Sequence, residues 1–163
     1  YCPGSINLRP FKGLKLDAFQ TDFEINVLGA VRSLKSVLGH LSASGDAAVV
    51  FYSTVAVQTG MPFHSSVASS KGAIEGLTRS LAAEFAPKIR VNAIAPSLVN
   101  TPLASKFLNN ETKMEKANER HPLGRVGSAT EIAQATAFLL SKESSWMTGR
   151  ILQLDGGIGN LKT

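Results

Sequence analysis

The stretch FHSSVASSKGAIEGLTRSLAAEF, residues 63–85, decides which fold this sequence adopts. From Val67 onward its apolar residues recur at helical spacing, which predicts one long helix that begins near residue 65. Pro87 lies just beyond, and because the residue before a proline disfavours helical geometry, the helix should end there. Lys71 follows Val67 by four residues, so both side chains should lie on one face of the helix.

Two short apolar runs on either side of this helix predict buried parallel strands. AAVVFY at residues 47–52 is a continuous apolar run without the polar alternation of a surface strand, and RVNAIA at residues 90–95 is the next strand. Helical spacing also predicts a long helix over residues 17–41, and the capping-box pattern SATE predicts another over residues 128–140. RILQLDGG, residues 150–157, reads as a strand and a glycine turn. Strands that alternate with helices predict an α/β fold in which helices cover both faces of a parallel sheet.

Length and composition predict a single globular domain, residues 1–163, because 44% of the residues are hydrophobic. No apolar run approaches the roughly 18 residues of a membrane span, and no secretory leader is readable. We therefore expect no membrane partner and a cytoplasmic location. The single cysteine, Cys2, allows neither an internal disulfide nor a thiolate metal site, so we expect no metal.

The charge pattern predicts a solvated surface rather than a nucleic-acid groove. Lys and Arg outnumber Asp and Glu by 17 to 12, but the basic residues are scattered along the chain without a long run. We therefore expect no nucleic-acid partner. The polar region at residues 97–121 predicts helical stretches around residues 103–109 and 112–119, and it is either a segment that covers a substrate or a surface excursion.

The order of these elements and motifs resembles the short-chain dehydrogenase/reductase family over residues 1–157. NAIAPSLVNTP after the second strand, HPLGRVG at residues 121–127 and the terminal LQLDGG occur in the order that the family uses. The resemblance implies a partial Rossmann-like, doubly wound parallel sheet with flanking helices. It also implies NAD or NADP as cofactor and a small-molecule carbonyl or alcohol substrate. The two long helices resemble those through which family members associate, so we expect a homo-oligomer.

Three residues match the catalytic set of the family. Asn26 lies where the family has its helix Asn, which would hold a water and the Lys, although a solvent-facing helix Asn is the alternative. Thr54 precedes Val67 by thirteen residues, the separation that the family uses between its Ser and Tyr, with Ser53 one residue off. Its hydroxyl would bond a substrate carbonyl, or it would bond local backbone. Lys71 matches the family Lys, which lowers the pKa of the Tyr and bonds the nicotinamide ribose.

Val67 occupies the position at which the resemblance implies the proton-donating Tyr. A general acid must carry a transferable proton, and a valine side chain has none. Four nearby residues are possible substitutes: Ser66 and Ser69 carry alcohols that ionise far above neutral pH, His64 titrates in a useful range, and Tyr52 lies on the preceding strand. None fits well, so we expect this chain alone to be inactive as a reductase.

Lys71 and the segment after the second strand match the cofactor-binding positions of the family. Pro96 and Ser97 begin that segment, and Val99 and Thr101 match the positions that contact the nicotinamide carboxamide. Ser97 replaces the usual Gly, so we expect crowding of any backbone that needs a positive φ.

The glycine-rich turn that would hold a pyrophosphate is not readable in this sequence. The cluster DGGIGN, residues 155–160, follows the last strand and leaves no room for a helix. The chain thus resembles the C-terminal portion of the family and lacks its N-terminal nucleotide-binding half. YCPG, with Cys2 and Pro3 in place of the family residues and Gly4 retained, resembles the end of a buried strand. We expect either a fragment or an obligate oligomer, and the alternative function is a degenerate, non-catalytic module for structure, binding or oligomerisation.

Overall fold

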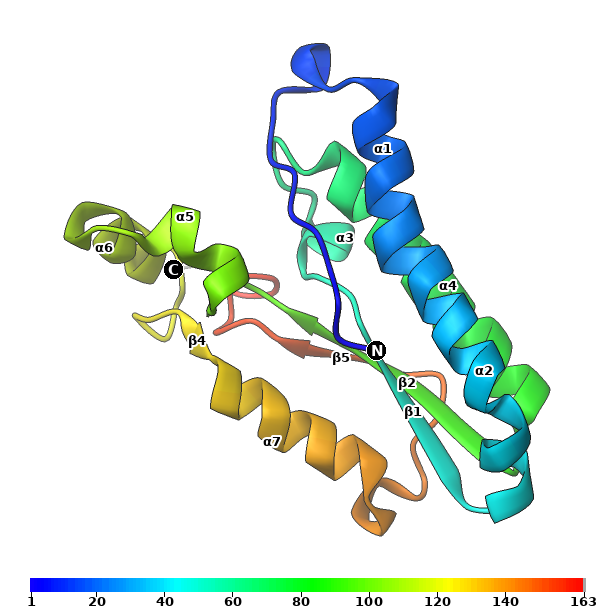
Figure 1. Ribbon diagram of the computed structural model, residues 1–163. Helices are drawn as coiled ribbons and strands as arrows, with labels where there is room; N and C mark the ends of the chain where they lie inside the picture. Colours follow the sequence, from blue (N-terminus) through cyan, green and yellow to red (C-terminus); the bar gives the residue numbers. More distant parts are fainter. Residues whose placement is uncertain (163) are drawn as a thin grey trace.

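A computed structural model describes residues 1–162 of the chain, with a three-stranded parallel sheet between helices (Figure 1). The strands are β1 (Ala47–Tyr52), β2 (Ile89–Pro96) and β5 (Ile151–Leu154), and they lie in the order β1-β2-β5. The predicted doubly wound parallel sheet is therefore confirmed. The helices are α1 (Leu16–Phe23), α2 (Gly29–Ser44), α3 (Ala56–Thr59), α4 (Ser65–Phe85), α5 (Ser105–Leu108), α6 (Glu111–Glu119) and α7 (Ala129–Leu140).

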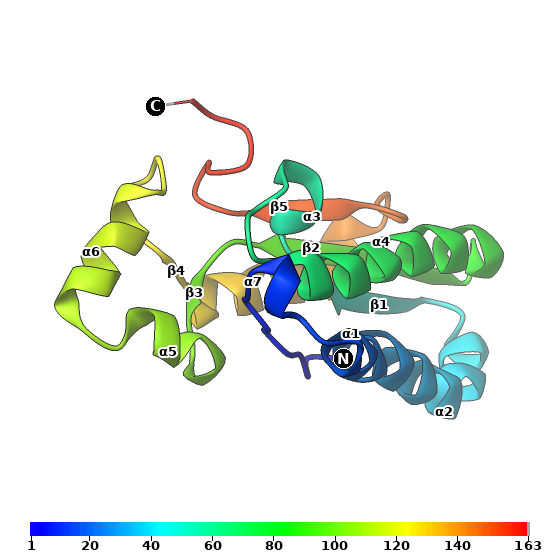
Figure 2. The same ribbon diagram turned by 90° about the horizontal axis from the view of Figure 1, so that it is seen from above.

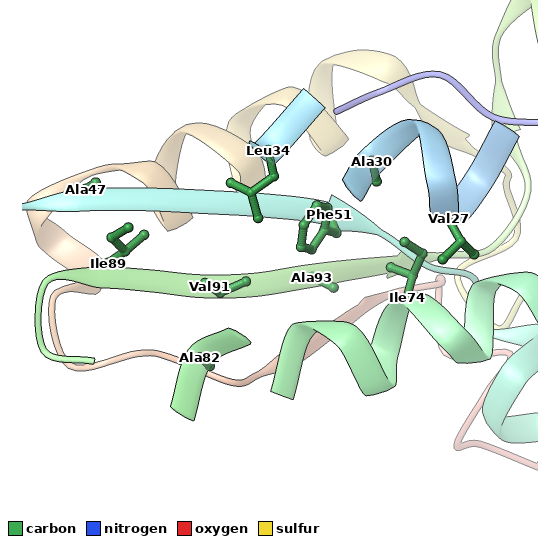
Figure 3. Packing of buried hydrophobic residues seen from close by; sticks show 10 residues of the cluster. All are labelled: Val27, Ala30, Leu34, Ala47, Phe51, Ile74, Ala82, Ile89, Val91 and Ala93. Atoms are coloured by element: carbon green, nitrogen blue, oxygen red, sulfur yellow. The ribbon is translucent and has the colours of Figure 1, made fainter. Parts of the chain in front are cut away.

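The two faces of the sheet have separate apolar cores. Phe51 of β1 points toward α2 and α4, where it joins a cluster that includes Ile74 of α4 and Leu34 of α2 (Figure 3). Val50, the neighbouring strand residue, packs instead against Leu139 of α7. Successive strand residues point to opposite faces, so one continuous apolar strand can serve both cores. Figure 1 shows the resulting layers, with α2 and α4 on one side of the strands and α7 on the other, and Figure 2 shows the strands side by side in the order β1, β2, β5.

The strands are in a register that brings their carboxyl ends together. Tyr52 at the end of β1 lies opposite Ile94 of β2, and Pro96 at the end of β2 lies opposite Leu154 of β5. The loops after these strands therefore emerge on one edge of the sheet. In open α/β sheets this edge is where ligands bind.

The long helix predicted over residues 17–41 is one continuous helical path with a wider turn inside it. The path comprises α1, a π-helical turn at Glu24–Leu28, and α2, so it extends slightly beyond the predicted bounds at both ends. It ends at Gly45, whose φ of 72° is left-handed and suits a residue without a side chain. Residues 97–121 contain α5 and α6 near the predicted stretches.

Two features of the chain departed from the sequence-based expectations. YCPG is not part of a strand: residues 1–10 have no regular secondary structure, and Cys2 is exposed. The Tyr1 hydroxyl donates a hydrogen bond of 2.8 Å to the Ile25 carbonyl, so the π-helical turn, not a neighbouring strand, holds the segment. A short parallel pair, β3 (Val99–Asn100) with β4 (Gly127–Ser128), was not predicted.

The capping box predicted at the start of α7 is confirmed. Ser128 Oγ accepts from the Glu131 N–H at 3.3 Å, and Glu131 Oε2 accepts from the Ser128 N–H at 2.8 Å. Hydrogen bonds from Arg125 and from Ser128 lower the pKa of Glu131 to about 2. The carboxylate is therefore charged at neutral pH and can accept these bonds.

Ser128→Ala should lower the free energy of unfolding by about 1 kcal/mol, because one N-terminal N–H of α7 loses its side-chain acceptor. The control is Ser36→Ala on α2, an exposed serine whose hydroxyl donates to the Ser33 carbonyl of its own helix. Urea unfolding of both variants measures the difference. Equal losses in the two variants would contradict the capping role.

Strand β1 pairs only with β2 among the described residues, so its outer edge offers unpaired backbone groups. Exposed strand edges promote association with other chains. We therefore expect this chain to form dimers or larger species when sedimentation is measured at micromolar concentration. A monodisperse monomer under those conditions contradicts the expectation.

Candidate functional site

Asn26 is the centre of a buried hydrogen-bond network beside the N-terminal segment. It lies in the π-helical turn and is 1% exposed. Its Nδ2 donates to Ser70 Oγ at 2.9 Å and to Ser5 Oγ at 3.2 Å, and its Oδ1 accepts from the Ser5 N–H at 3.2 Å. The alternative of a solvent-facing Asn is thus excluded. Its hydrogen-bond partners are two serines that the sequence interpretation did not identify.

Lys71 reaches from α4 over the end of β1. Its Nζ donates a hydrogen bond of 2.9 Å to the carbonyl of Tyr52, the last residue of that strand. Burial lowers the pKa of Lys71 from its ordinary 10.5 to about 8. Coulombic interactions with Cys2 and Asp22 act in the opposite direction and raise this pKa in part. At neutral pH the side chain is mostly an ammonium with further N–H donors available.

Gly4 is the point at which Asn26 and Lys71 converge. A Cβ atom placed on this glycine would lie 3.5 Å from Asn26 Oδ1 and 3.6 Å from Lys71 Nζ. A larger side chain there would cover both polar atoms. The glycine therefore lets the N-terminal backbone pass close to both side chains and leaves the ammonium uncovered on this side, which gives a local reason for Gly4 in YCPG.

Val67 is buried on α4, one turn before Lys71, as the helical spacing predicted. Its neighbour Ser66 does not replace a proton donor, because it is also buried and its hydroxyl donates to Asp22 Oδ2 at 2.5 Å. The hydroxyl of Ser69 donates back to the Ser65 carbonyl at 2.7 Å on the exposed side of the helix. These hydrogen bonds direct neither serine hydroxyl toward the region between Asn26 and Lys71.

The two remaining substitutes are also engaged elsewhere. Nδ1 of His64 lies 2.8 Å from the Pro62 carbonyl before the helix begins. The Tyr52 hydroxyl shares a hydrogen bond of 2.8 Å with Thr136 on α7, on the opposite face of the sheet from α4. Burial raises the pKa of the Tyr52 phenol, and the bond with Thr136 lowers it in part.

The hydroxyls at the end of β1 have different surroundings. Thr54 Oγ1 accepts a hydrogen bond of 3.3 Å from the Ala56 N–H, which is the local backbone contact considered as the alternative to substrate binding. Ser53 is buried and its hydroxyl donates to Glu75 Oε1 at 2.8 Å. Of the two, only Thr54 is partly exposed at the ligand edge of the sheet.

The segment from Pro96 to Thr101 is held between the ends of β1 and β5. The Pro96 carbonyl accepts from the Val55 N–H at 3.0 Å, and the Ser97 N–H donates to the Leu154 carbonyl at 3.2 Å. Val99 pairs with Gly127 in the small second sheet, and Thr101 Oγ1 donates to the Val99 carbonyl at 3.4 Å.

The expectation that Ser97 crowds a positive-φ backbone is wrong. Among residues 1–162 the only non-glycine residue with a positive φ is Phe63. Ser97 instead bonds His121, whose Nε2 lies 2.9 Å from Ser97 Oγ and whose Nδ1 lies 2.7 Å from the Ala117 carbonyl. The sequence interpretation missed this contact; the only signal for it was the histidine that opens HPLGRVG.

The described residues show no other kind of site. None of the helices within residues 1–162 combines the length and apolar character needed to cross a membrane. The same residues contain no cluster of three or more His, Cys, Asp or Glu side chains that could hold a metal ion.

The sequence and the fold have counterparts among known proteins. A family model described as Enoyl-(Acyl carrier protein) reductase matches residues 3–159. A tropinone reductase homologue from Arabidopsis thaliana is 35% identical over 95% of this chain and 60% of its own length. L-xylulose reductase from Bos taurus is 35% identical over 92% of this chain and 62% of its own length.

The solved structures agree with this result. A gluconate 5-dehydrogenase from Burkholderia cenocepacia, in complex with NADP and tartrate, is 26% identical and superposes with a TM-score of 0.90. The match covers 98% of this chain and 63% of that protein. The chain therefore belongs to the short-chain dehydrogenase/reductase family and has its Rossmann-like fold, and it spans about three fifths of the length of these relatives.

The buried ammonium predicts a pH-dependent stability. Unfolded Lys71 keeps its proton up to about pH 10.5, whereas the folded chain releases it near pH 8, so the unfolded state binds more protons between these values. The free energy of unfolding should therefore rise with pH across this range, by about 3 kcal/mol, relative to Lys71→Met. Urea unfolding of both proteins at several pH values tests this, and a pH-independent difference would contradict it.

Proposed function

We propose that this chain forms the nicotinamide-ribose end of an NAD(P)-linked oxidoreductase site, and that it does not by itself interconvert carbonyls and alcohols. The convergence of Asn26 and Lys71 on Gly4 supports the binding role. Val67 supports the second part of the proposal, that the chain does not by itself interconvert carbonyls and alcohols. It stands one turn before Lys71 on the same helix, where the family places its proton donor, and its side chain has no proton to transfer.

The residues around Gly4 fit the ribose of a nicotinamide nucleotide. Lys71 uses one N–H for the Tyr52 carbonyl, which leaves two N–H donors for sugar hydroxyls. The absence of a side chain at Gly4 leaves room for their approach. The nucleotide, when bound, would supply the hydride. NAD and NADP are both compatible with this part of the site, and the NADP complex of the Burkholderia cenocepacia relative supports a nucleotide cofactor.

The segment Pro96, Ser97, Val99 and Thr101 would contact the nicotinamide end. Its backbone is fixed on both sides, by Val55 after β1 and by Leu154 of β5, so it can serve as a rigid wall. A rigid wall lowers the entropy that is lost when a ligand binds. The wall lies at the same sheet edge as Thr54.

The substrate of a complete site would be a small carbonyl or alcohol. The names of the relatives, a tropinone reductase homologue and an L-xylulose reductase, support this class. Thr54 would donate its hydroxyl to the carbonyl oxygen of such a substrate. Without a general acid at residue 67, the alkoxide that forms on reduction has no side-chain proton source next to Lys71.

A non-catalytic binding or oligomerisation module is the second candidate function, and Val67 is the observation that favours it. Under this alternative the Asn26 network would be retained for folding alone, because buried polar groups need hydrogen-bond partners in any case. The two candidates differ in whether the chain binds a nicotinamide nucleotide.

NADH and NADPH should show saturable binding when nucleotide fluorescence is followed during a titration of this chain. Lys71→Met should weaken the binding by about tenfold or more, because a charge-assisted hydrogen bond to the ribose is lost. The matched control is Lys12→Met, which removes an exposed lysine that makes none of the contacts of the proposed site. Absence of binding up to millimolar nucleotide would contradict the binding role and favour the structural module.

Val67→Tyr should introduce carbonyl reduction, because it restores a phenol one turn before Lys71. General-acid catalysis typically contributes about 10²–10⁴-fold, so this is the expected gain in rate. Val67→Phe is the matched control, because it places an aromatic ring of similar size at the same buried position but without a hydroxyl. Steady-state oxidation of NADPH with a panel of small ketones measures both. Equal activity in the two variants would contradict the assignment of residue 67.

A further inference from the structure

Asp22 of α1 is a fully buried carboxylate that the proposed function does not use. Its exposure is 0%, yet both oxygens are satisfied. Oδ1 accepts from Ser5 Oγ at 2.6 Å and from Asn7 Nδ2 at 2.7 Å, and Oδ2 accepts from Ser66 Oγ at 2.5 Å. A buried charge without such partners would be very unfavourable. Three donors from two other parts of the chain therefore converge on one carboxylate.

Ser5 links this carboxylate directly to Asn26. A serine hydroxyl has one proton, and Ser5 gives it to Asp22. The Ser5 oxygen then accepts from Asn26 Nδ2 at 3.2 Å, and the Ser5 N–H donates to Asn26 Oδ1 at 3.2 Å. The orientation of the Asn26 amide is therefore set by the direction of the bond between Ser5 and Asp22.

The same carboxylate also fixes the two other components of the ribose site. Ser66 lies in the first turn of α4, the helix that carries Lys71. Ser5 immediately follows Gly4, on which Asn26 and Lys71 converge. A single side chain on α1 therefore ties the N-terminal segment to the start of α4.

We propose that Asp22 is the positioning residue of the nicotinamide-ribose site: through Ser5 and Ser66 it orients the Asn26 amide and holds Gly4 beside Lys71. It acts through other residues and contacts no ligand itself. The inference rests on the proposed function for its consequence in binding, but the relay from Asp22 to Asn26 can be measured without any ligand.

The negative charge of Asp22 has a second measurable effect, in addition to the hydrogen-bonded relay from Asp22 through Ser5 to Asn26. The charged and titratable groups that act on Lys71 are Cys2 from the N-terminal segment and Asp22 from α1, whereas Tyr52 of β1 contacts it through the backbone carbonyl only. Glu75, one turn along α4, is already engaged by Ser53 and by Arg79. Coulombic interactions with Cys2 and Asp22 raise the pKa of Lys71. Removal of the Asp22 charge should therefore lower the pKa of Lys71 further.

The test compares Asp22→Asn with Asp17→Asn, which makes the same charge change at an exposed position of the same helix. NMR titration of the Lys71 side chain, assigned with Lys71→Met, should give a pKa below about 8 in Asp22→Asn and an unchanged value in Asp17→Asn. NADH binding should weaken about tenfold in Asp22→Asn alone. A folded Asp22→Asn protein with an unchanged Lys71 pKa and unchanged NADH binding overturns the proposal, because the carboxylate then affects neither Lys71 nor the ribose site.

Ser5→Ala provides a test that does not require Asp22→Asn to fold. It keeps the carboxylate bonded to Asn7 and Ser66 and removes the hydroxyl that accepts from Asn26 Nδ2, while the backbone N–H of residue 5 can still donate to Asn26 Oδ1. Hydrogen exchange of the Asn26 side-chain amide should become about tenfold faster, with no nucleotide present. Unchanged exchange overturns the relay. If the relay responds but the wild-type chain binds no nucleotide, the positioning of Asn26 stands and the proposed function fails.

Discussion

The packing of α4 against the sheet is the constraint on which the rest of the structure depends. Ile74 is fully buried between this helix and the strands, and Val67 is buried two turns earlier. Because side chains three and four residues apart share a helix face, burying this pair also places Lys71 on the sheet side of α4. Its ammonium then reaches the carbonyl of Tyr52, the last residue of β1. The position of the site therefore follows from the hydrophobic packing of one helix.

A site placed in this way is held together by the fold and does not depend on a reaction taking place there. Asn26 is held by two serines inside a buried network, and any replacement would remove the hydrogen bonds that join it to Ser5 and Ser70. Such networks stabilise a fold whether or not chemistry occurs there. A proton donor at residue 67 would contribute to the reaction instead, and a buried valine at this position packs in the core without one. Membership in the short-chain dehydrogenase/reductase family therefore establishes the fold, whereas activity depends on individual side chains.

The sequence predicted the elements of the fold well because their signals are local. The apolar runs of β1 and β2 and the capping box at Ser128 are each contained in a few residues. The π-helical turn was not predicted, since apolar spacing does not distinguish one wider turn within a long helix. YCPG was misread as a strand because a short apolar segment does not reveal which neighbours will pair with it.

The candidate site was predicted in part, for the same physical reason. Lys71 and Asn26 were found because each lies in a recognisable local motif, but the contacts that position them join residues far apart in the chain. Asp22 meets Ser5 and Ser66 only after folding, and no spacing rule connects these three positions. Ser97 was expected to strain the backbone, yet it bonds His121 across the loop region.

In the proposed function, this chain binds the nicotinamide ribose but has no proton donor at residue 67. The most direct test is an NMR titration of the chain with NADH and a ketone together. Signals of Lys71 and of the Asn26 side chain should shift saturably with NADH, while the NADH absorbance stays constant over hours. Shifts confined to other parts of the chain would contradict the retained site. Steady oxidation of NADH with formation of the alcohol would contradict the missing proton donor.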